Sequence, residues 1–101
     1  MKKAYSLDTI KKNSIPIAKE YGVAKLYVFG SYARGEATES SDIDFLIDKG
    51  SMRNLWQYFG FVAALENLFK VHIGVVTTTS CDRDFLDRIQ KETILIYEPE
   101  G

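Results

Sequence analysis

Four short runs of apolar residues, set between longer amphipathic stretches, are the feature that most constrains how this chain can fold. The runs lie at residues 24–29, 43–48, 71–77 and 93–98. Within 43–48 the residues alternate, so that Ile43, Phe45 and Ile47 share one face of a strand. The runs therefore predict three strands, followed by a fourth that is either a strand or an extended tail.

Three stretches outside these runs have the spacing of amphipathic helices. The first, residues 6–22, ends at Gly22 and contains Pro16, which would kink the helix or split it into two pieces. The second, 52–69, is the longest, and the third, 82–92, is short. The apolar stripe of the second helix consists of Leu55, Phe59, Val62, Leu65 and Phe69. This order of elements predicts a small α/β (α+β) fold with helices against one sheet, although the strand order does not follow from it.

Length, charge and cysteine content limit the class of protein. A chain of 101 residues is enough for one domain, which we expect to span residues 1–101. A net charge of -1 and a pI near 5.8 make DNA or RNA a poor fit as the main partner. No apolar run approaches the roughly 20 residues that a membrane span needs, and the start lacks the apolar segment of a signal peptide. The single cysteine, Cys81, excludes an internal disulfide, so we expect a cytoplasmic protein.

Two short patterns near the second strand suggest chemistry. Gly30 and Ser31 follow the first strand, where a glycine lets the backbone approach a ligand and a hydroxyl joins the backbone N–H groups around a phosphate. Asp42 and Asp44 stand two residues apart, so both carboxylates point to one side and repel unless a cation lies between them. Each pattern alone also fits an ordinary turn or a solvated strand edge.

Together the two patterns predict one site. A polar loop of about ten residues would bring phosphates held at Gly30 and Ser31 against a metal held by Asp42 and Asp44. That layout serves phosphoryl or nucleotidyl transfer, which depends on positioning and charge stabilisation. Arg34 lies on the loop, where its guanidinium could reach a phosphate or form a salt bridge with Glu36 or Glu39.

The stretch "GSYARGEATESSDID" resembles the signature of the minimal nucleotidyltransferases of the DNA polymerase β superfamily, the MNT proteins paired with HEPN-domain partners. The resemblance implies a mixed sheet flanked by helices and Mg²⁺-nucleotide chemistry with ATP. It implies phosphate binding by Gly30 and Ser31, and catalytic metal binding by Asp42 and Asp44. Members of the family are antitoxins, some of which transfer AMP from ATP to a tyrosine of the HEPN toxin. Adenylylation of a partner protein is thus the sharpest functional expectation.

The chain departs from the family pattern at the third carboxylate. The family has an aspartate on the strand after the long helix, and the run "VHIGVVT" places Gly74 at that position. The missing group would hold the metal and accept the proton of the attacking hydroxyl. His72 lies two residues earlier on the same side and is a possible substitute base, or alternatively a half-exposed structural residue. We expect weak or absent transfer, and the alternative function is an inactive antitoxin that neutralises its partner by binding alone.

The long helix carries more aromatic residues than one stripe can bury. Tyr58 and Phe61 lie off the predicted apolar face, beside Trp56 and Phe59. They belong either to a thick core or to a surface for a partner or a second copy of the chain. Cys81 precedes the third predicted helix and is expected to be an idle or buried thiol rather than a nucleophile.

Overall fold

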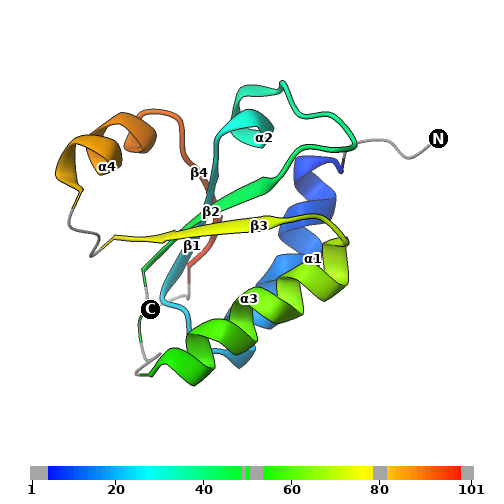
Figure 1. Cartoon of the computed structure of the whole chain (residues 1–101), viewed down its shortest axis with the longest axis vertical. Helices are drawn as coiled ribbons and strands as arrows, with labels where there is room; N and C mark the ends of the chain where they lie inside the picture. The colour runs from blue at the N-terminus through cyan, green and yellow to red at the C-terminus, as the bar shows by residue number, and fades with distance from the viewer. Residues whose placement is uncertain (1–4, 49, 51–53, 79–81, 99–101) are drawn as a thin grey trace.

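The computed structural model describes residues 5–48, 50, 54–78 and 82–98. Figure 1 shows that the strands form one sheet with helices packed against it. The elements in chain order are α1 (Leu7–Glu20), β1 (Lys25–Phe29), α2 (Ser31–Arg34), β2 (Ile43–Asp48), α3 (Leu55–Phe69), β3 (Ile73–Thr77), α4 (Arg83–Gln90) and β4 (Ile94–Tyr97). The predicted helices and strands are all present. The last apolar run is a paired strand rather than a tail.

The sheet has the strand order β3-β2-β1-β4. The central strand β1 runs antiparallel to both β2 and β4, whereas β2 and β3 are parallel. A parallel pair needs a long crossover, which α3 supplies between β2 and β3. The predicted mixed sheet flanked by helices is therefore confirmed.

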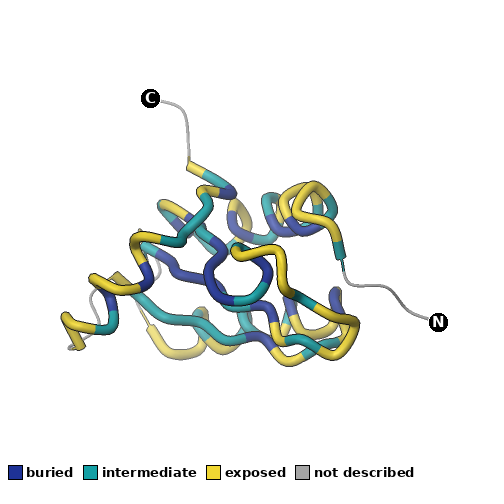
Figure 2. The backbone as a smooth tube through the Cα atoms, turned by 90° about the horizontal axis from the view of Figure 1, so that it is seen from above, coloured by how far each residue is buried: buried dark blue, intermediate teal, exposed yellow. Residues whose placement is uncertain are grey.

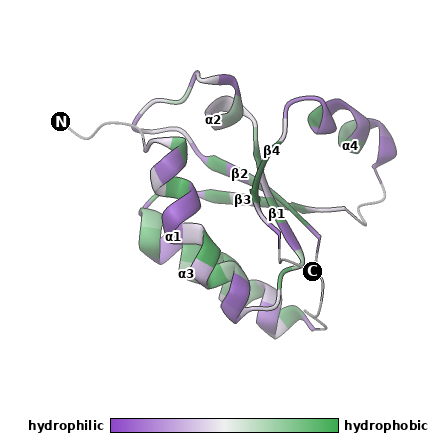
Figure 3. Cartoon of the chain, turned by 180° about the vertical axis from the view of Figure 1, so that it is seen from behind, coloured by the Kyte–Doolittle hydropathy of each residue, from purple (hydrophilic) through white to green (hydrophobic). Residues whose placement is uncertain are grey.

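The two faces of the sheet are covered unequally. Helices α1 and α3 pack side by side on one face, and α4 lies alone on the other, as Figure 3 shows. Buried stretches of the backbone gather in the middle of the molecule in Figure 2. The larger core lies under α1 and α3, and the alternation in β2 sends Ile43, Phe45 and Ile47 into it. The smaller core, under α4, consists of Phe29, Leu46, Leu86 and Ile89.

Side-chain caps start three of the helices. The Ser6 hydroxyl accepts a hydrogen bond from the Thr9 N–H, Asn54 caps α3, and Asp82 caps α4. Helix α1 continues through Pro16, so the proline does not split it into two helices. Caps at these positions fix where each helix begins relative to the sheet.

The predicted apolar stripe of α3 is partly wrong. Leu55 and Phe59 are exposed, whereas Phe61, which the spacing placed off the main face, is completely buried. Leu65 and Phe69 are buried as predicted. Apolar residues occur on every side of this helix, so periodicity could not choose between neighbouring faces. The surplus of aromatic residues is divided between core and surface, because Phe61 is buried and Tyr58 packs against the core, whereas Trp56 is 84% and Phe59 56% exposed.

Some sequence predictions fall beyond the described part of the chain. Cys81 is one of them, and so are residues 52 and 53 at the predicted start of the long helix. Within the described residues, no helix has the length and hydropathy needed to cross a membrane.

Candidate functional site

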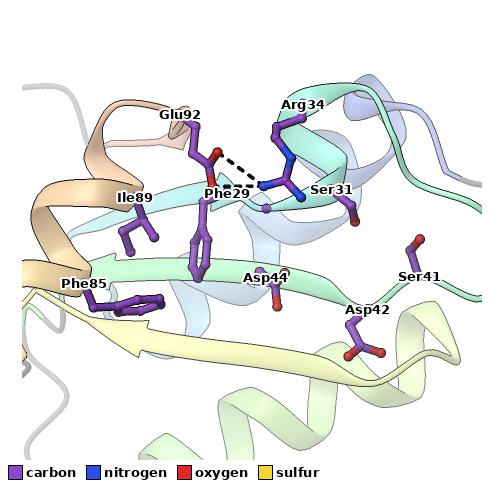
Figure 4. A pocket seen from close by; sticks show the side chains of 10 residues that line it. Phe29, Ser31, Arg34, Ser41, Asp42, Asp44, Phe85, Ile89 and Glu92 are labelled. Carbon is purple, nitrogen blue, oxygen red and sulfur yellow. Dashed lines mark hydrogen bonds and ion pairs between the residues drawn. The ribbon is translucent and has the colours of Figure 1, made fainter.

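A cavity of about 410 Å³ opens on the α4 face of the sheet, at the end where β1 finishes and β2 begins. This volume lies in the range of small-ligand sites, about 300–1,000 Å³. Figure 4 shows the side chains that line it. They are Phe29, Gly30, Ser31, Arg34, Ser41, Asp42, Asp44, Phe85, Ile89 and Glu92. The loop between β1 and β2 thus brings Gly30, Ser31 and Arg34 to the same hollow as the two aspartates, as the sequence predicted.

Asp42 and Asp44 differ in their surroundings. Asp42 stands just before β2 and is exposed, whereas Asp44 lies within the strand and is partly buried. Burial raises the pKa of Asp44 above its usual value, and the negative charge of Asp42 raises the pKa further. Electrostatic interactions with His72 and then with Arg34 lower the pKa of Asp44 and oppose this shift only in part. A cation beside the two carboxylates would offset both the burial of Asp44 and the repulsion from Asp42. The pair is therefore electrostatically suited to binding a cation.

Glycines flank the Asp44 carboxylate on both neighbouring strands. Gly30 follows Phe29, the ladder partner of Asp44 on β1, and Gly74 is its partner on β3. A Cβ added at Gly74 would lie 2.7 Å from Asp44 Oδ1, and one added at Gly30 would run into Asp44 Oδ2. The absence of side chains at both positions therefore creates the slot that the carboxylate occupies.

Gly30 also has a backbone conformation that only glycine adopts readily. Its φ of 74° and ψ of -149° lie in a region essentially closed to other residues. Gly30→Ala is expected to lower the free energy of unfolding by about 1–3 kcal/mol and to displace Asp44. Urea denaturation measures the first effect. Gly35→Ala is the comparison, because Gly35 has the same φ but a ψ of 22° in the left-handed helical region, and no atom lies within 4 Å of an added Cβ; an equal loss in both variants would contradict the combined effect of the Gly30 conformation and the Asp44 contact.

Arg34 is held by two carboxylates. Its Nε donates to Glu36 at 2.7 Å, and its Nη1 donates to both oxygens of Glu92 at 3.2 and 3.3 Å (Figure 4). The Glu36 pair is one of the alternatives that the sequence suggested, whereas the Glu92 pair joins residues far apart in the chain. Arg34 still lines the cavity, so its guanidinium remains beside the space that a phosphate would enter.

His72 lies beside Asp42 rather than among the residues that line the cavity. Its Nδ1 is 3.4 Å from Asp42 Oδ2, and both side chains are largely exposed. The backbone N–H of Ile43 donates to the carbonyl of His72, which ties the start of β3 to the start of β2. The imidazole is thus placed to orient Asp42, and its use as a base stays a prediction.

The donor set fits a hard divalent cation that completes its shell with other oxygens. Mg²⁺ takes one or two carboxylates together with waters and substrate phosphates, and Asp42 and Asp44 supply such a pair. Among the residues that the structure describes, no group of three or more acidic, histidine or cysteine side chains is arranged to hold a metal. A cation here would therefore complete its shell with other oxygens, such as those of waters or substrate phosphates.

Half of the cavity was not foreseen from the sequence. Phe29, Phe85, Ile89 and Glu92 line it together with Ser41, and the sequence singled out none of them as site residues. Phe85 and Ile89 come from α4 and Glu92 from the turn after it, all more than 40 residues beyond the acidic pair. The only signal in the sequence was the strongly amphipathic pattern of 82–92, which predicts a packed helix but not what it packs beside.

Comparison with known proteins assigns the chain to a family. Residues 12–100 match the family described as "Polymerase beta, Nucleotidyltransferase", and the chain belongs to this family. A Methanocaldococcus jannaschii protein with the provisional name protein adenylyltransferase MJ0435 is 35% identical over 88% of this chain and 96% of its own length. The protein adenylyltransferase MntA of Thermococcus cleftensis is 30% identical over 79% of this chain and 81% of its own.

Within that family the chain is a minimal nucleotidyltransferase. A solved structure provisionally described as a minimal nucleotidyltransferase superposes with a TM-score of 0.76 at 29% identity, covering 89% of this chain and 95% of the other. The resemblance seen in the sequence and the nucleotidyltransferase class of enzyme are both confirmed. Enzymes of this family act with a divalent metal and a nucleotide.

Proposed function

We propose that this chain is an antitoxin that uses ATP and Mg²⁺ to transfer AMP to a tyrosine of a HEPN-domain toxin. In this reaction the tyrosine oxygen bonds to the α-phosphorus of ATP, the bond to the β-phosphate breaks, and pyrophosphate leaves with its electrons. The tyrosine proton passes to a base. The observation that carries the proposal is the meeting of Asp42, Asp44 and the Gly30–Ser31 turn in one cavity.

Relatives and structural neighbours support the chemistry and the partner. MntA of Thermococcus cleftensis is named a protein adenylyltransferase. A solved complex from Shewanella oneidensis holds a tri-AMPylated HEPN toxin with its MNT antitoxin, and the present chain superposes on it with a TM-score of 0.70. At 13% identity that likeness is one of fold, so the partner class is part of the proposal.

Each proposed site residue has a defined task. Asp42 and Asp44 would hold the cation, which neutralises charge on the phosphates and polarises the α-phosphorus. Backbone N–H groups and the hydroxyl at Gly30 and Ser31 would hold phosphate oxygens. Arg34 would supply positive charge at the rim of the same cavity.

Incubation of the chain with ATP, Mg²⁺ and the HEPN-domain protein of its own organism tests the proposal. The expected result is a gain in the intact mass of the partner equal to one or more AMP groups, located on tyrosine by peptide mapping. The Asp42→Ala, Asp44→Ala double variant should produce no gain. A partner that never gains this mass under any tested metal would contradict the enzyme function.

Gly74 favours a second candidate, an antitoxin that acts by binding alone. It stands opposite Asp44, where a third carboxylate would complete the acidic group, and glycine supplies neither a ligand nor a base. In that case the partner's activity would be inhibited without any change in mass, and the double aspartate variant would inhibit as well as the wild-type chain.

A further inference from the structure

The cavity divides into a polar half and an apolar half. The polar half contains the residues to which the proposed function gives tasks, from Gly30 to Asp44. The apolar half is formed by Phe29, Phe85 and Ile89, with Glu92 at its edge, and has no task so far. Figure 4 shows the two aromatic rings and Ile89 on one side of the Asp44 carboxylate, with Asp42 on the other.

Phe85 presents an aromatic surface that the core does not fully use. Its ring meets the ring of Phe29 edge-to-face, with centroids 6.1 Å apart and an interplanar angle of 79°. Phe29 and Ile89 are buried, whereas Phe85 is only partly buried and lines the hollow. The edge-to-face contact holds the ring of Phe85 in place without covering both of its faces.

The apolar half has room beyond the phosphate site. A second hollow of about 280 Å³ adjoins it along α4, and Phe85, Ile89 and Glu92 line both. Arg88 completes the lining of the second hollow. The space therefore continues from the acidic pair along the surface of α4, with an apolar wall and a charged rim.

This wall begins one residue from the proposed phosphate turn. Phe29 directly precedes Gly30 and forms the ring contact with Phe85, so aromatic surface and phosphate turn are covalently adjacent. In a nucleotide, a flat base is joined to the phosphates through a single sugar. A ligand whose phosphates lie at Gly30 thus has its base within reach of the wall, and bases stack on aromatic side chains.

We propose that Phe85, backed by Phe29 and Ile89, forms the nucleobase subsite of this enzyme. The inference rests on the proposed function. It assigns the recognition of the nucleotide base to α4, a helix that carries none of the site residues predicted from the sequence. Arg34 and Glu92 connect the two halves, because their ion pair joins α2, which begins at the phosphate turn, to the turn after α4.

Calorimetric titration with two probes tests this assignment. MgATP carries a base, whereas Mg-tripolyphosphate offers only the phosphates and the metal. Phe85→Leu keeps an apolar side chain against Phe29 but loses the ring. It is expected to weaken MgATP binding by roughly 5- to 150-fold, the range for loss of one base–aromatic stack. Tripolyphosphate affinity should stay unchanged.

Controls separate this inference from the proposed function. Phe59→Leu removes an exposed ring on α3, on the opposite face of the sheet, and should change neither affinity. Phe85→Trp should retain MgATP binding, and the wild-type chain should bind MgATP more tightly than tripolyphosphate. Equal MgATP affinity in the wild-type chain and Phe85→Leu would overturn the base subsite but not the proposed function. The same holds if Phe85→Leu lowers only AMP transfer, because the wall would then receive the acceptor tyrosine and not the base. No MgATP binding by the wild-type chain would overturn both proposals.

Discussion

Asp44→Asn is expected to abolish Mg²⁺-dependent ATP binding and to lower AMP transfer by on the order of 10²–10³-fold, the scale of removing one preorganised electrostatic group from an active site. The substitution keeps the shape of the side chain within the slot between Gly30 and Gly74, so it removes charge rather than packing. Titration calorimetry with ATP, with and without Mg²⁺, measures the binding, and partner mass measures the transfer.

The same variant should be more stable than the wild-type apoprotein at neutral pH. Burial, and then the charge of Asp42, raise the pKa of Asp44 in the folded chain, so the folded state holds this proton at pH values where the unfolded state has released it. Stability from this group is therefore lost as pH rises from the usual aspartate pKa to the raised one, and stays lost above it. Asp44→Asn removes that loss. Urea denaturation in EDTA, repeated across this pH range, measures the effect. As pH rises, the free energy of unfolding of the wild-type chain should fall relative to that of Asp44→Asn.

Magnesium and a neighbouring aspartate provide the controls for Asp44. Added Mg²⁺ should stabilise the wild-type chain at neutral pH and leave Asp44→Asn unaffected. Asp48 lies on the same face of β2, and its carboxylate accepts a hydrogen bond from the Gly50 N–H, which an asparagine oxygen can also accept. Asp48→Asn should thus keep metal-dependent binding. Equal loss in both variants, or Mg²⁺ stabilisation of Asp44→Asn, would contradict the metal-binding role of Asp44.

The sequence predicted the polar half of the cavity because its residues are close together in the chain. Gly30, Ser31, Arg34, Asp42 and Asp44 lie within 15 residues, and a strand, a turn and a second strand suffice to bring them together. The alternation in β2 was equally readable, since a period of two decides which side chains enter the core. Local spacing in the sequence was therefore enough to predict which residues form the polar half of the cavity.

The apolar half depends on contacts that no local pattern encodes. Phe29 and Phe85 are far apart in the chain and meet because α4 crosses the face of the sheet that α1 and α3 leave open. The Arg34–Glu92 pair depends on the same placement. In α3, apolar residues on all sides hid the buried face, and Phe61 was assigned to the wrong side. The strand order, which positions the sheet face that α4 covers, could not be read from the periodicity.

Gly74→Asp is expected to raise AMP transfer about 10²–10⁴-fold, the usual contribution of a general base. Gly74 pairs with Asp44 across the parallel strands, so an aspartate there would place a third carboxylate beside the first two. The new Cβ would meet Asp44 Oδ1 at 2.7 Å, and the Asp44 carboxylate would have to turn toward the cavity. Single-turnover transfer to the HEPN-domain partner measures the gain at saturating MgATP.

The gain should be accompanied by a loss of stability in the apoprotein. Three neighbouring carboxylates repel one another more than two, so Gly74→Asp should unfold at lower urea concentration in EDTA and recover with Mg²⁺. Gly74→Asn has the same shape without the charge, and it should show neither the rate gain nor the Mg²⁺-dependent recovery. A gain in rate with Gly74→Asn would attribute the effect to packing against Asp44 rather than to a base.

An unchanged rate in Gly74→Asp would mean that another group already accepts the proton of the acceptor hydroxyl. His72 is the candidate within this chain, because its Nδ1 lies 3.4 Å from Asp42 Oδ2 at the edge of the site. Robust wild-type transfer that persists in His72→Ala would exclude it and would contradict the expected weak activity. The base would then be another group, such as a residue of the partner, an oxygen of the nucleotide or Glu92 at the edge of the cavity, and Gly74 would be a slot for Asp44 rather than the mark of a degenerate enzyme.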